Sequence, residues 1–357
     1  MEQAIPTQMR ALVYRGANDL RIETVPVPDI SDEELLVRVG VCGVCPTDIK
    51  KIQHATVPPP RIFGHETAGV IIRVGSRVKG FSDGDRVALH HHVPCLECHA
   101  CRHKAFSQCP VYRKTGVTAG FEPAGGGFAE YVRVLPFVFP GIVPIPAGNL
   151  LEEGALLEPV NTVLKGVRRL GLLRGDRVWV AGQGPVGLLF TRILTLEGVS
   201  VVASDLIGER LELSQNYGAT EVYLADEADF GERLRRSAGG GFDAVVVAVP
   251  VDDLVCLGMD RLRGGGKILL FAHTKKGAMR DVDLGEICVA EKDVMGSYSA
   301  DITLQEEVAD LVFSRKLDVR GLVSHRFTLE DAVAAVGVAA RPRSGTLKVV
   351  VQQAERA

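Results

Sequence analysis

Short apolar runs rich in β-branched residues recur along the first 134 residues of the chain, and glycine and proline separate them. The runs LLVRVGV (35–41), AGVIIRVG (68–75) and DRVALHH (85–91) have the length and composition of β-strands. The N-terminal part of the chain is therefore predicted to be mainly β.

The pattern changes from Gly175 onwards, where uninterrupted apolar runs alternate with helix-like stretches such as PVGLLFTRILTLEG (185–198) and GERLELSQNYG (208–218). The apolar runs are RVWVAG, VSVVASD, DAVVVAVP and GKILLFA. Such alternation is typical of a parallel sheet covered by helices on both faces. After Ser297 the composition is mixed again and ends in the strand-like LKVVVQQ (347–353). The fold class predicted is α/β.

Size and charge narrow the class of protein. With 357 residues the chain exceeds the size of a usual single core, so two domains are expected. Its 46% hydrophobic and 24% charged residues are ordinary for a globular protein. A net charge of -3 without a basic cluster argues against nucleic acid or a membrane surface as partner. No export signal or membrane-spanning run is apparent, so we expect a cytoplasmic protein with a small-molecule ligand.

Four cysteines are packed into one short segment with the spacing C-x2-C-x2-C-x7-C. They are Cys95, Cys98, Cys101 and Cys109. Four thiolates can surround one zinc ion tetrahedrally and leave no open position, so the pattern predicts a structural zinc site. Disulfides are disfavoured by the short spacing and the expected reducing compartment. His99 and His103 are alternative ligands, whereas Cys256 and Cys288 are expected to be ordinary buried thiols.

Candidates for a second, reactive metal site occur in three places. These are the segments CGVCPTD (42–48), GHE (64–66) and LEP (157–159). A catalytic zinc needs about three protein ligands of the Cys, His or carboxylate type and one open position. Each segment alone is a weak signal, because a single buried Cys or His is more often structural. Only their combination indicates a metal.

A glycine-rich turn follows the predicted strand 177–181 and opens a predicted helix. The turn has the pattern GxGxxG, and we expect its residues Gly182, Gly184, Pro185, Val186 and Gly187 to bind a dinucleotide. The glycines allow the pyrophosphate to approach a helix N-terminus, where free N–H groups favour anions. Asp205 ends the next strand, where a carboxylate would accept hydrogen bonds from the adenosine ribose. NAD is expected to be preferred over NADP, because a 2′-phosphate would meet the charge of Asp205 without an adjacent arginine to offset it. Arg210 is expected to flank the adenine.

The chain resembles the zinc-containing medium-chain dehydrogenase/reductase (alcohol dehydrogenase) family, especially its sorbitol or polyol dehydrogenase branch. The resemblance covers nearly everything from Met9 onwards and rests on motifs in the family's order. They are CGVCPTD, GHETAGV, GDRVAL, the four-cysteine loop, GGGFAEYV, LEPVNTVLKGV and AGQGPVGLL. The resemblance implies a GroES-like, mainly-β catalytic domain formed by residues 1–158 and 297–357, with a Rossmann NAD-binding domain at 159–296.

Carried onto this sequence, the resemblance makes Cys45 and His65 ligands of a catalytic zinc, with Glu66 as an additional or exchanging ligand. Cys42 is the alternative to Cys45, although only Cys45 is followed by the matching Thr-Asp pair. Thr47 becomes the proton-relay hydroxyl. Glu158 stands where alcohol dehydrogenases have a second cysteine, as in the polyol branch. The four clustered cysteines become ligands of a structural zinc, giving two Zn2+ per chain.

The function implied is hydride transfer between NAD and a secondary alcohol, such as a polyol, sugar alcohol or cyclitol. A threonine or amino-alcohol dehydrogenase of the same fold is one alternative, and a non-catalytic NAD-binding redox sensor is another. The resemblance also implies a homodimer or homotetramer, for which residues 283–299 are the candidate contact region.

Overall fold

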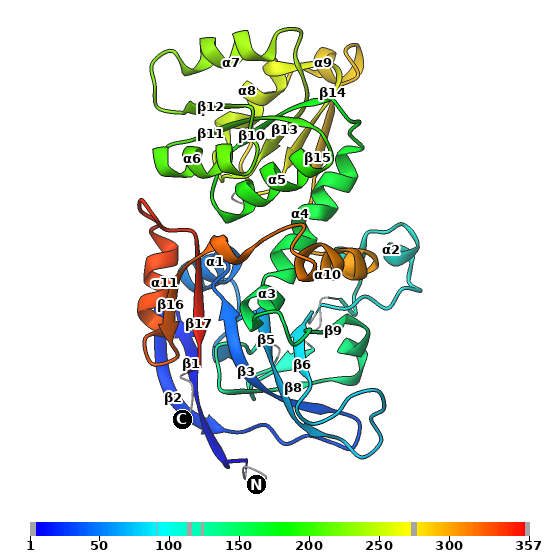
Figure 1. The fold of residues 1–357 in the computed structure, drawn as a ribbon, viewed down its shortest axis with the longest axis vertical. Helices are drawn as coiled ribbons and strands as arrows, with labels where there is room; N and C mark the ends of the chain where they lie inside the picture. Colours follow the sequence, from blue (N-terminus) through cyan, green and yellow to red (C-terminus); the bar gives the residue numbers. More distant parts are fainter. Residues whose placement is uncertain (1–4, 91, 113–115, 123–124, 273–276, 354–357) are drawn as a thin grey trace. The chain divides into compact units, whose positions relative to one another are not determined.

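A computed structural model describes residues 5–90, 92–112, 116–122, 125–272 and 277–353. The chain divides into two compact units (Figure 1). The first unit comprises Met1–Pro159 and Ala300–Ala357, and the second comprises Val160–Ser299. Helix α4 (Leu157–Leu170) begins in the first unit and continues into the second.

The second unit is built on a parallel sheet, for which the described residues give six strands in the order β12-β11-β10-β13-β14-β15. The strands are β10 (Arg177–Ala181), β11 (Ser200–Asp205), β12 (Glu221–Leu224), β13 (Phe242–Val247), β14 (Leu262–Leu270) and β15 (Asp293–Gly296). The order reverses beside β10, which is where doubly wound sheets bind ligands at the carboxyl ends of their strands. The predicted doubly wound parallel sheet is confirmed.

Helices cover both faces of this sheet (Figure 1). Besides α4 they are α5 (Pro185–Leu196), α6 (Gly208–Asn216), α7 (Phe230–Ala238), α8 (Asp253–Arg261) and α9 (Leu284–Cys288). Trp179 of β10 is fully buried between strands and α7, and its indole N–H donates to Ser204 Oγ at 2.9 Å. The strands are apolar on both faces because helices cover both, as the uninterrupted apolar runs indicate.

The first unit is mainly β. Its small sheet has the order β2-β1-β4, with β1 (Gln8–Gly16), β2 (Asp19–Pro26) and β4 (Arg61–Ile62). The larger sheet has the order β16-β17-β3-β5-β6-β9, and β8 pairs with β3 and β7. Its strands are β3 (Leu35–Gly43), β5 (Glu66–Val74), β6 (Arg86–Leu89), β7 (Val117–Thr118), β8 (Tyr131–Val134), β9 (Ile142–Pro144), β16 (Val323–Thr328) and β17 (Lys348–Gln352).

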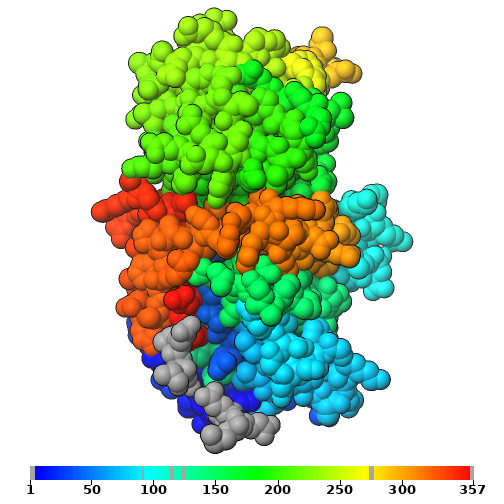
Figure 2. Space-filling view, in the orientation of Figure 1, coloured from blue at the N-terminus to red at the C-terminus, as the bar shows by residue number. Residues whose placement is uncertain are grey.

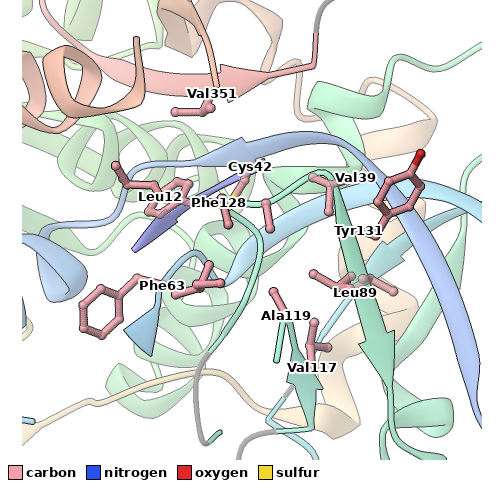
Figure 3. Packing of buried hydrophobic residues seen from close by; sticks show 14 of the residues in the cluster. Leu12, Val39, Cys42, Phe63, Leu89, Val117, Ala119, Phe128, Tyr131 and Val351 are labelled. Carbon is pink, nitrogen blue, oxygen red and sulfur yellow. The ribbon is translucent and has the colours of Figure 1, made fainter. Parts of the chain in front are cut away.

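The core of the first unit joins both ends of the chain. Strand β17 pairs antiparallel with β3, so that Val351 lies opposite Cys42. Figure 3 shows Val351, Leu12, Cys42 and Phe128 among the buried side chains of this core. The unit's helices are α1 (Pro46–His54), α2 (His99–Arg102), α3 (Leu151–Ala155), α10 (Gln305–Phe313) and α11 (Ala332–Ala340), with 3-10 turns at Phe106–Gln108, Pro136–Gly141, Ile302–Leu304 and Arg320–Leu322. The C-terminal segment is therefore part of the framework that holds β3.

Two further properties concern the length of the helices and the exposure of two cysteines. Within the described residues, every helix is too short or too polar to cross a membrane. The expectation that Cys256 and Cys288 are buried was wrong, because both thiols are exposed, on α8 and at the end of α9. Their helices turn these positions outwards, which the apolar character of cysteine does not reveal.

Candidate metal centres and dinucleotide loop

The four clustered cysteines bring their sulfur atoms together around one point. The Sγ–Sγ distances are 3.5 Å for Cys98 and Cys101, 3.6 Å for Cys95 and Cys109, and 3.9 Å for Cys95 and Cys101. Four sulfurs bound tetrahedrally to zinc at about 2.3 Å lie about 3.8 Å apart, whereas a disulfide needs about 2.05 Å. The donor set and its spacing therefore fit a closed, structural zinc site.

The thiols of this loop do not ionise equally. Burial opposes the ionisation of Cys109, but N–H donors of Cys95 and Tyr112 and the neighbouring thiols outweigh it and lower its pKa to about 6. Burial raises the pKa of Cys101 to about 12. The Cys109 thiolate is thus stabilised by the protein, whereas a cation would be needed to hold Cys101 as a thiolate. His99 and His103 contact each other, with ring centroids 4.5 Å apart, and are not members of the donor group.

A second donor group consists of the Cys45 sulfur, a His65 ring nitrogen and a Glu66 carboxylate oxygen, all within 4.8 Å of one another. Cys45 caps the N-terminus of α1, and the backbone N–H of Thr47 donates to its sulfur at 3.5 Å. His65 directly precedes β5, and Glu66 is the first residue of that strand. A helix start and a strand start, 20 positions apart, therefore present the three donors together.

Asp48 orients the imidazole of His65. The Nδ1 atom of His65 lies 3.1 Å from a carboxylate oxygen of Asp48, and both side chains are buried. Burial alone would lower the pKa of His65, but Asp48 and Cys45 raise it well above its ordinary value. Burial would likewise raise the pKa of Asp48, yet His65 lowers it. With Nδ1–H donated to Asp48, Nε2 is left as the nitrogen that can bind a metal.

Lys348 holds the carboxylate of Glu66. Its Nζ donates to both Glu66 oxygens at 2.7 Å, and the pair is buried although the two residues are 282 positions apart. Burial would lower the pKa of Lys348, but Glu66 and Cys45 raise it. Gly43 makes room for this pair, because a Cβ atom there would come within 1.9 Å of Glu66 Oε2. Sequence reasoning missed both Lys348 and Asp48, although Asp48 is part of the CPTD segment.

Glu158 and Cys42 lie outside the three-donor group. Burial, together with the nearby Glu66 carboxylate, raises the pKa of Glu158 to about 7 against the effect of His65. Cys42 is fully buried; it accepts a hydrogen bond from Thr67 Oγ1 at 3.4 Å, and burial raises the pKa of its thiol. A thiol, an imidazole and a carboxylate are donors that zinc accepts, so the three-donor group suits a divalent cation. Cys42 is a core thiol.

The glycine-rich turn has the geometry that a dinucleotide requires. β10 ends at Ala181, and Gly184 is the N-cap of α5, whose first residue is Pro185. At Gly187 a Cβ atom would lie 1.8 Å from the carbonyl oxygen of Gly182, so only glycine allows this close turn. Val186 lies in the first turn of α5. Free N–H groups at this helix start are suited to a pyrophosphate.

Asp205 ends β11 beside this turn. Its carboxylate accepts hydrogen bonds from the backbone N–H groups of Gln183 at 2.6 Å and Ile207 at 2.9 Å. The expectation that no arginine lies beside Asp205 was wrong, because the Arg210 guanidinium is 3.8 Å from its carboxylate. Arg210 lies in the first turn of α6, which brings its side chain back to the end of β11. The sequence alone does not show this, because the contact depends on how α6 packs after the strand.

Comparison with known proteins identifies the chain's relatives. An alcohol dehydrogenase GroES-like domain matches residues 31–147, and a zinc-binding dehydrogenase domain matches residues 185–314. Sorbitol dehydrogenase of Bacillus subtilis (strain 168) is 29% identical, with 98% of this chain and 99% of that protein aligned. D-arabinitol dehydrogenase 1 of Uromyces fabae is 30% identical over 92% and 93%. A Sinorhizobium meliloti 1021 structure described as a zinc-binding dehydrogenase bound to NADP is 26% identical, with a TM-score of 0.86 over 97% and 100%.

The chain therefore belongs to the zinc-containing medium-chain dehydrogenase/reductase family, in its polyol dehydrogenase branch. It is an oxidoreductase that uses zinc and a nicotinamide dinucleotide and acts on a small-molecule alcohol. The predicted family, fold class and enzyme class are confirmed.

Proposed function

We propose that the protein oxidises a secondary hydroxyl of a polyol, sugar alcohol or cyclitol with NAD, at a catalytic zinc held by Cys45, His65 and Glu66, with Glu158 as the further carboxylate. The observation that carries this proposal is the convergence of the first three donor atoms within 4.8 Å. Relatives named for sorbitol and D-arabinitol support the substrate class. The four-cysteine loop holds the structural zinc.

The protein's own residues have distinct roles in this proposal. Zinc bound in the centre would polarise the substrate hydroxyl, and the nicotinamide would accept the hydride. Asp48 accepts the hydrogen bond of His65 Nδ1, so that Nε2 would be the nitrogen available to hold the zinc. Lys348 keeps the Glu66 carboxylate in place. Thr47, on the first turn of α1 beside Cys45, would accept the proton of the substrate hydroxyl while its own proton passes to a hydroxyl of the cofactor ribose and from there to solvent.

The loop from Gly182 to Gly187 binds the pyrophosphate, and Asp205 selects NAD by accepting hydrogen bonds from the ribose hydroxyls. Arg210, at 3.8 Å from Asp205, weakens this selection because it offsets part of the carboxylate's charge. A moderate preference for NAD follows, and the ratio of kcat/KM for NAD and NADP measures it.

We also propose a homodimer or homotetramer formed through β15. This strand lies at the end of the sheet, and the surrounding residues expose large apolar side chains. They are Leu284, Ile287, Val289, Val294 and Tyr298. An open strand edge with apolar side chains is suited to pairing with a second copy.

The test is NAD reduction by the zinc-loaded enzyme with sorbitol, xylitol, D-arabinitol, myo-inositol, threonine and 2-butanol. The highest kcat/KM is expected for a polyol or cyclitol, and zinc removal by a chelator should abolish turnover. Preference for threonine would instead identify an amino-alcohol dehydrogenase. Tight NADH binding without turnover of any alcohol would identify a redox sensor.

A further inference from the structure

A pocket of about 850 Å³ lies within the first unit, on the larger sheet. Its lining comes from the middle of β3, from β5, β8, β16 and the end of β17, and from the start of α3. Glu66 and Lys348 are the first residues of β5 and β17, whereas the pocket is lined by Val70 in the middle of β5 and by Gln352 at the end of β17, so the pocket is separate from the metal centre. Its volume falls within the range of about 300–1,000 Å³ that is typical of small-molecule sites.

The charged residues of the pocket do not all compensate one another. Arg326 donates to both oxygens of Glu152, at 2.6 and 2.8 Å. The backbone N–H of Arg10 donates to Glu130 at 2.7 Å, and the Arg10 guanidinium lies 3.7 Å from the same carboxylate and pairs more closely with Glu330. Arg38 has no ion pair or side-chain hydrogen bond with any residue that the structure describes. One half-buried positive charge therefore remains available to a ligand.

Tyr131 presents a second unused polar group beside this charge. Only 5% of Tyr131 is exposed. Its hydroxyl nevertheless has no hydrogen-bond partner among the residues that the structure describes. Tyr131 lies directly opposite Arg38 in the β3–β8 register, so both side chains project from the same face of the sheet. Figure 3 shows the Tyr131 oxygen pointing away from the other labelled core side chains.

Apolar and amide groups form the rest of the lining. Leu150 and Leu151 come from the start of α3, and Val70 comes from β5. Gln352 and Gln353 supply amides at the end of the C-terminal strand. On the face drawn in Figure 2, red atoms from the C-terminal part of the chain lie beside blue atoms from its N-terminal part. The pocket thus combines a carbon-binding wall with one cation and one hydroxyl.

We propose that this pocket binds a small organic carboxylate. The carboxylate would accept hydrogen bonds from the Arg38 guanidinium and the Tyr131 hydroxyl, and the carbon skeleton would lie against Leu150 and Leu151. A single uncompensated cation matches a monoanion, whereas Glu130 and Glu152 nearby disfavour a doubly charged phosphate.

Isothermal titration calorimetry on the zinc-loaded enzyme tests this proposal, with benzoate and octanoate as probes, benzamide as the neutral analogue of benzoate, and inorganic phosphate. We expect at least one carboxylate to bind, and benzoate to bind more tightly than benzamide. Arg38→Gln should weaken the binding carboxylate by at least about tenfold, because it removes a charge-assisted hydrogen bond. Tyr131→Phe should weaken it by roughly fivefold and leaves the core packing intact.

Arg73→Gln is the matched control, because Arg73 is an exposed arginine on β5 that lies outside the pocket. It should change carboxylate affinity by less than about twofold. If the carboxylate bound directly to the catalytic zinc, its affinity would be equal in the wild type, Arg38→Gln and Tyr131→Phe. That result would overturn the proposal. Failure of both carboxylates to bind, or tighter binding of phosphate, would also overturn it. None of these outcomes depends on turnover of an alcohol.

Discussion

The two candidate metal centres of the first unit use opposite designs. The four-cysteine loop takes all its donors from residues 95–109, and the donors are of one kind. The centre at Cys45 mixes a thiol, an imidazole and a carboxylate, and it depends on Lys348 near the other end of the chain. The first centre is a property of one loop, whereas the second is a property of the assembled unit.

This difference corresponds to different chemistry. Four thiolates around a zinc ion would complete a tetrahedral shell and leave no position for substrate, so the role proposed for the loop is structural. Mixed donors, with supporting partners such as Asp48 and Lys348, leave room for a substrate oxygen and tune the metal. The loop should therefore contribute to stability and the mixed centre to rate, and the following substitutions test that separation.

The largest effect is expected from Cys45→Ser. It removes a soft donor from the mixed centre and should lower kcat/KM by at least about 10³-fold, because the metal contributes several kcal/mol to the transition state. Steady-state kinetics and zinc content should show one zinc lost and the fold retained. Cys101→Ser should instead lower thermal stability while the folded enzyme keeps its activity within about tenfold.

Cys256→Ser is the control for both variants, since this thiol is exposed and far from either group along the chain. It should change neither zinc content nor activity. The separation between the two centres fails if Cys101→Ser lowers kcat/KM as much as Cys45→Ser in protein that is still folded.

Lys348→Met tests how far the mixed centre depends on the C-terminal strand. It leaves the buried Glu66 carboxylate without its partner, which should lower the free energy of unfolding by about 3–5 kcal/mol. Urea denaturation measures this, with Lys348→Arg retaining most of the stability. Lys316→Met, at an exposed lysine, is the control. A loss below about 1 kcal/mol would show that Glu66 does not rely on this ion pair.

Asp48→Asn tests the support of His65 while preserving the shape of the side chain. Loss of the carboxylate that receives Nδ1–H should weaken zinc at the mixed centre by about 10–100-fold. Competition with a chromogenic chelator measures both zinc affinities in one titration. The four-cysteine site should be unchanged, as should both sites in Asp29→Asn, an exposed control. Equal weakening of both sites would mean that Asp48 acts on the fold rather than on His65.

The same contrast explains how much the sequence could predict. The four-cysteine loop and the turn from Gly182 to Gly187 are short patterns whose spacing reflects their geometry directly. The doubly wound sheet was predictable because its strands are buried on both faces and read as uninterrupted apolar runs. Such features depend on local chain geometry.

Other features depend on contacts that spacing does not encode. Lys348 meets Glu66 only because β17 pairs with β3, which in turn pairs with β5. Arg210 reaches Asp205 through the placement of α6 after β11. Arg38 and Tyr131 become neighbours through the β3–β8 register. An isolated sequence gives no sign of these pairs, because each one is created by tertiary structure.

The smallest effect is expected from a substitution of His90, a buried histidine that lies between the two donor groups in the sequence. Its ring nitrogens have no hydrogen-bond partner in the described part of the chain. Burial, with His65 nearby and against the effects of His92 and Asp301, lowers its pKa to about 4. Below the ordinary pKa of about 6.5, His90 therefore binds a proton in the unfolded chain but stays neutral in the folded protein. The free energy of unfolding falls as the pH drops. The free energy of unfolding should fall less between pH 7.5 and pH 5.5 in His90→Leu than in the wild type, by about 1 kcal/mol, as measured by urea unfolding at both pH values. The zinc content and kcat/KM of His90→Leu should stay unchanged. A loss of zinc would instead show that His90 is a metal ligand, and the two centres could then not be separated as described above.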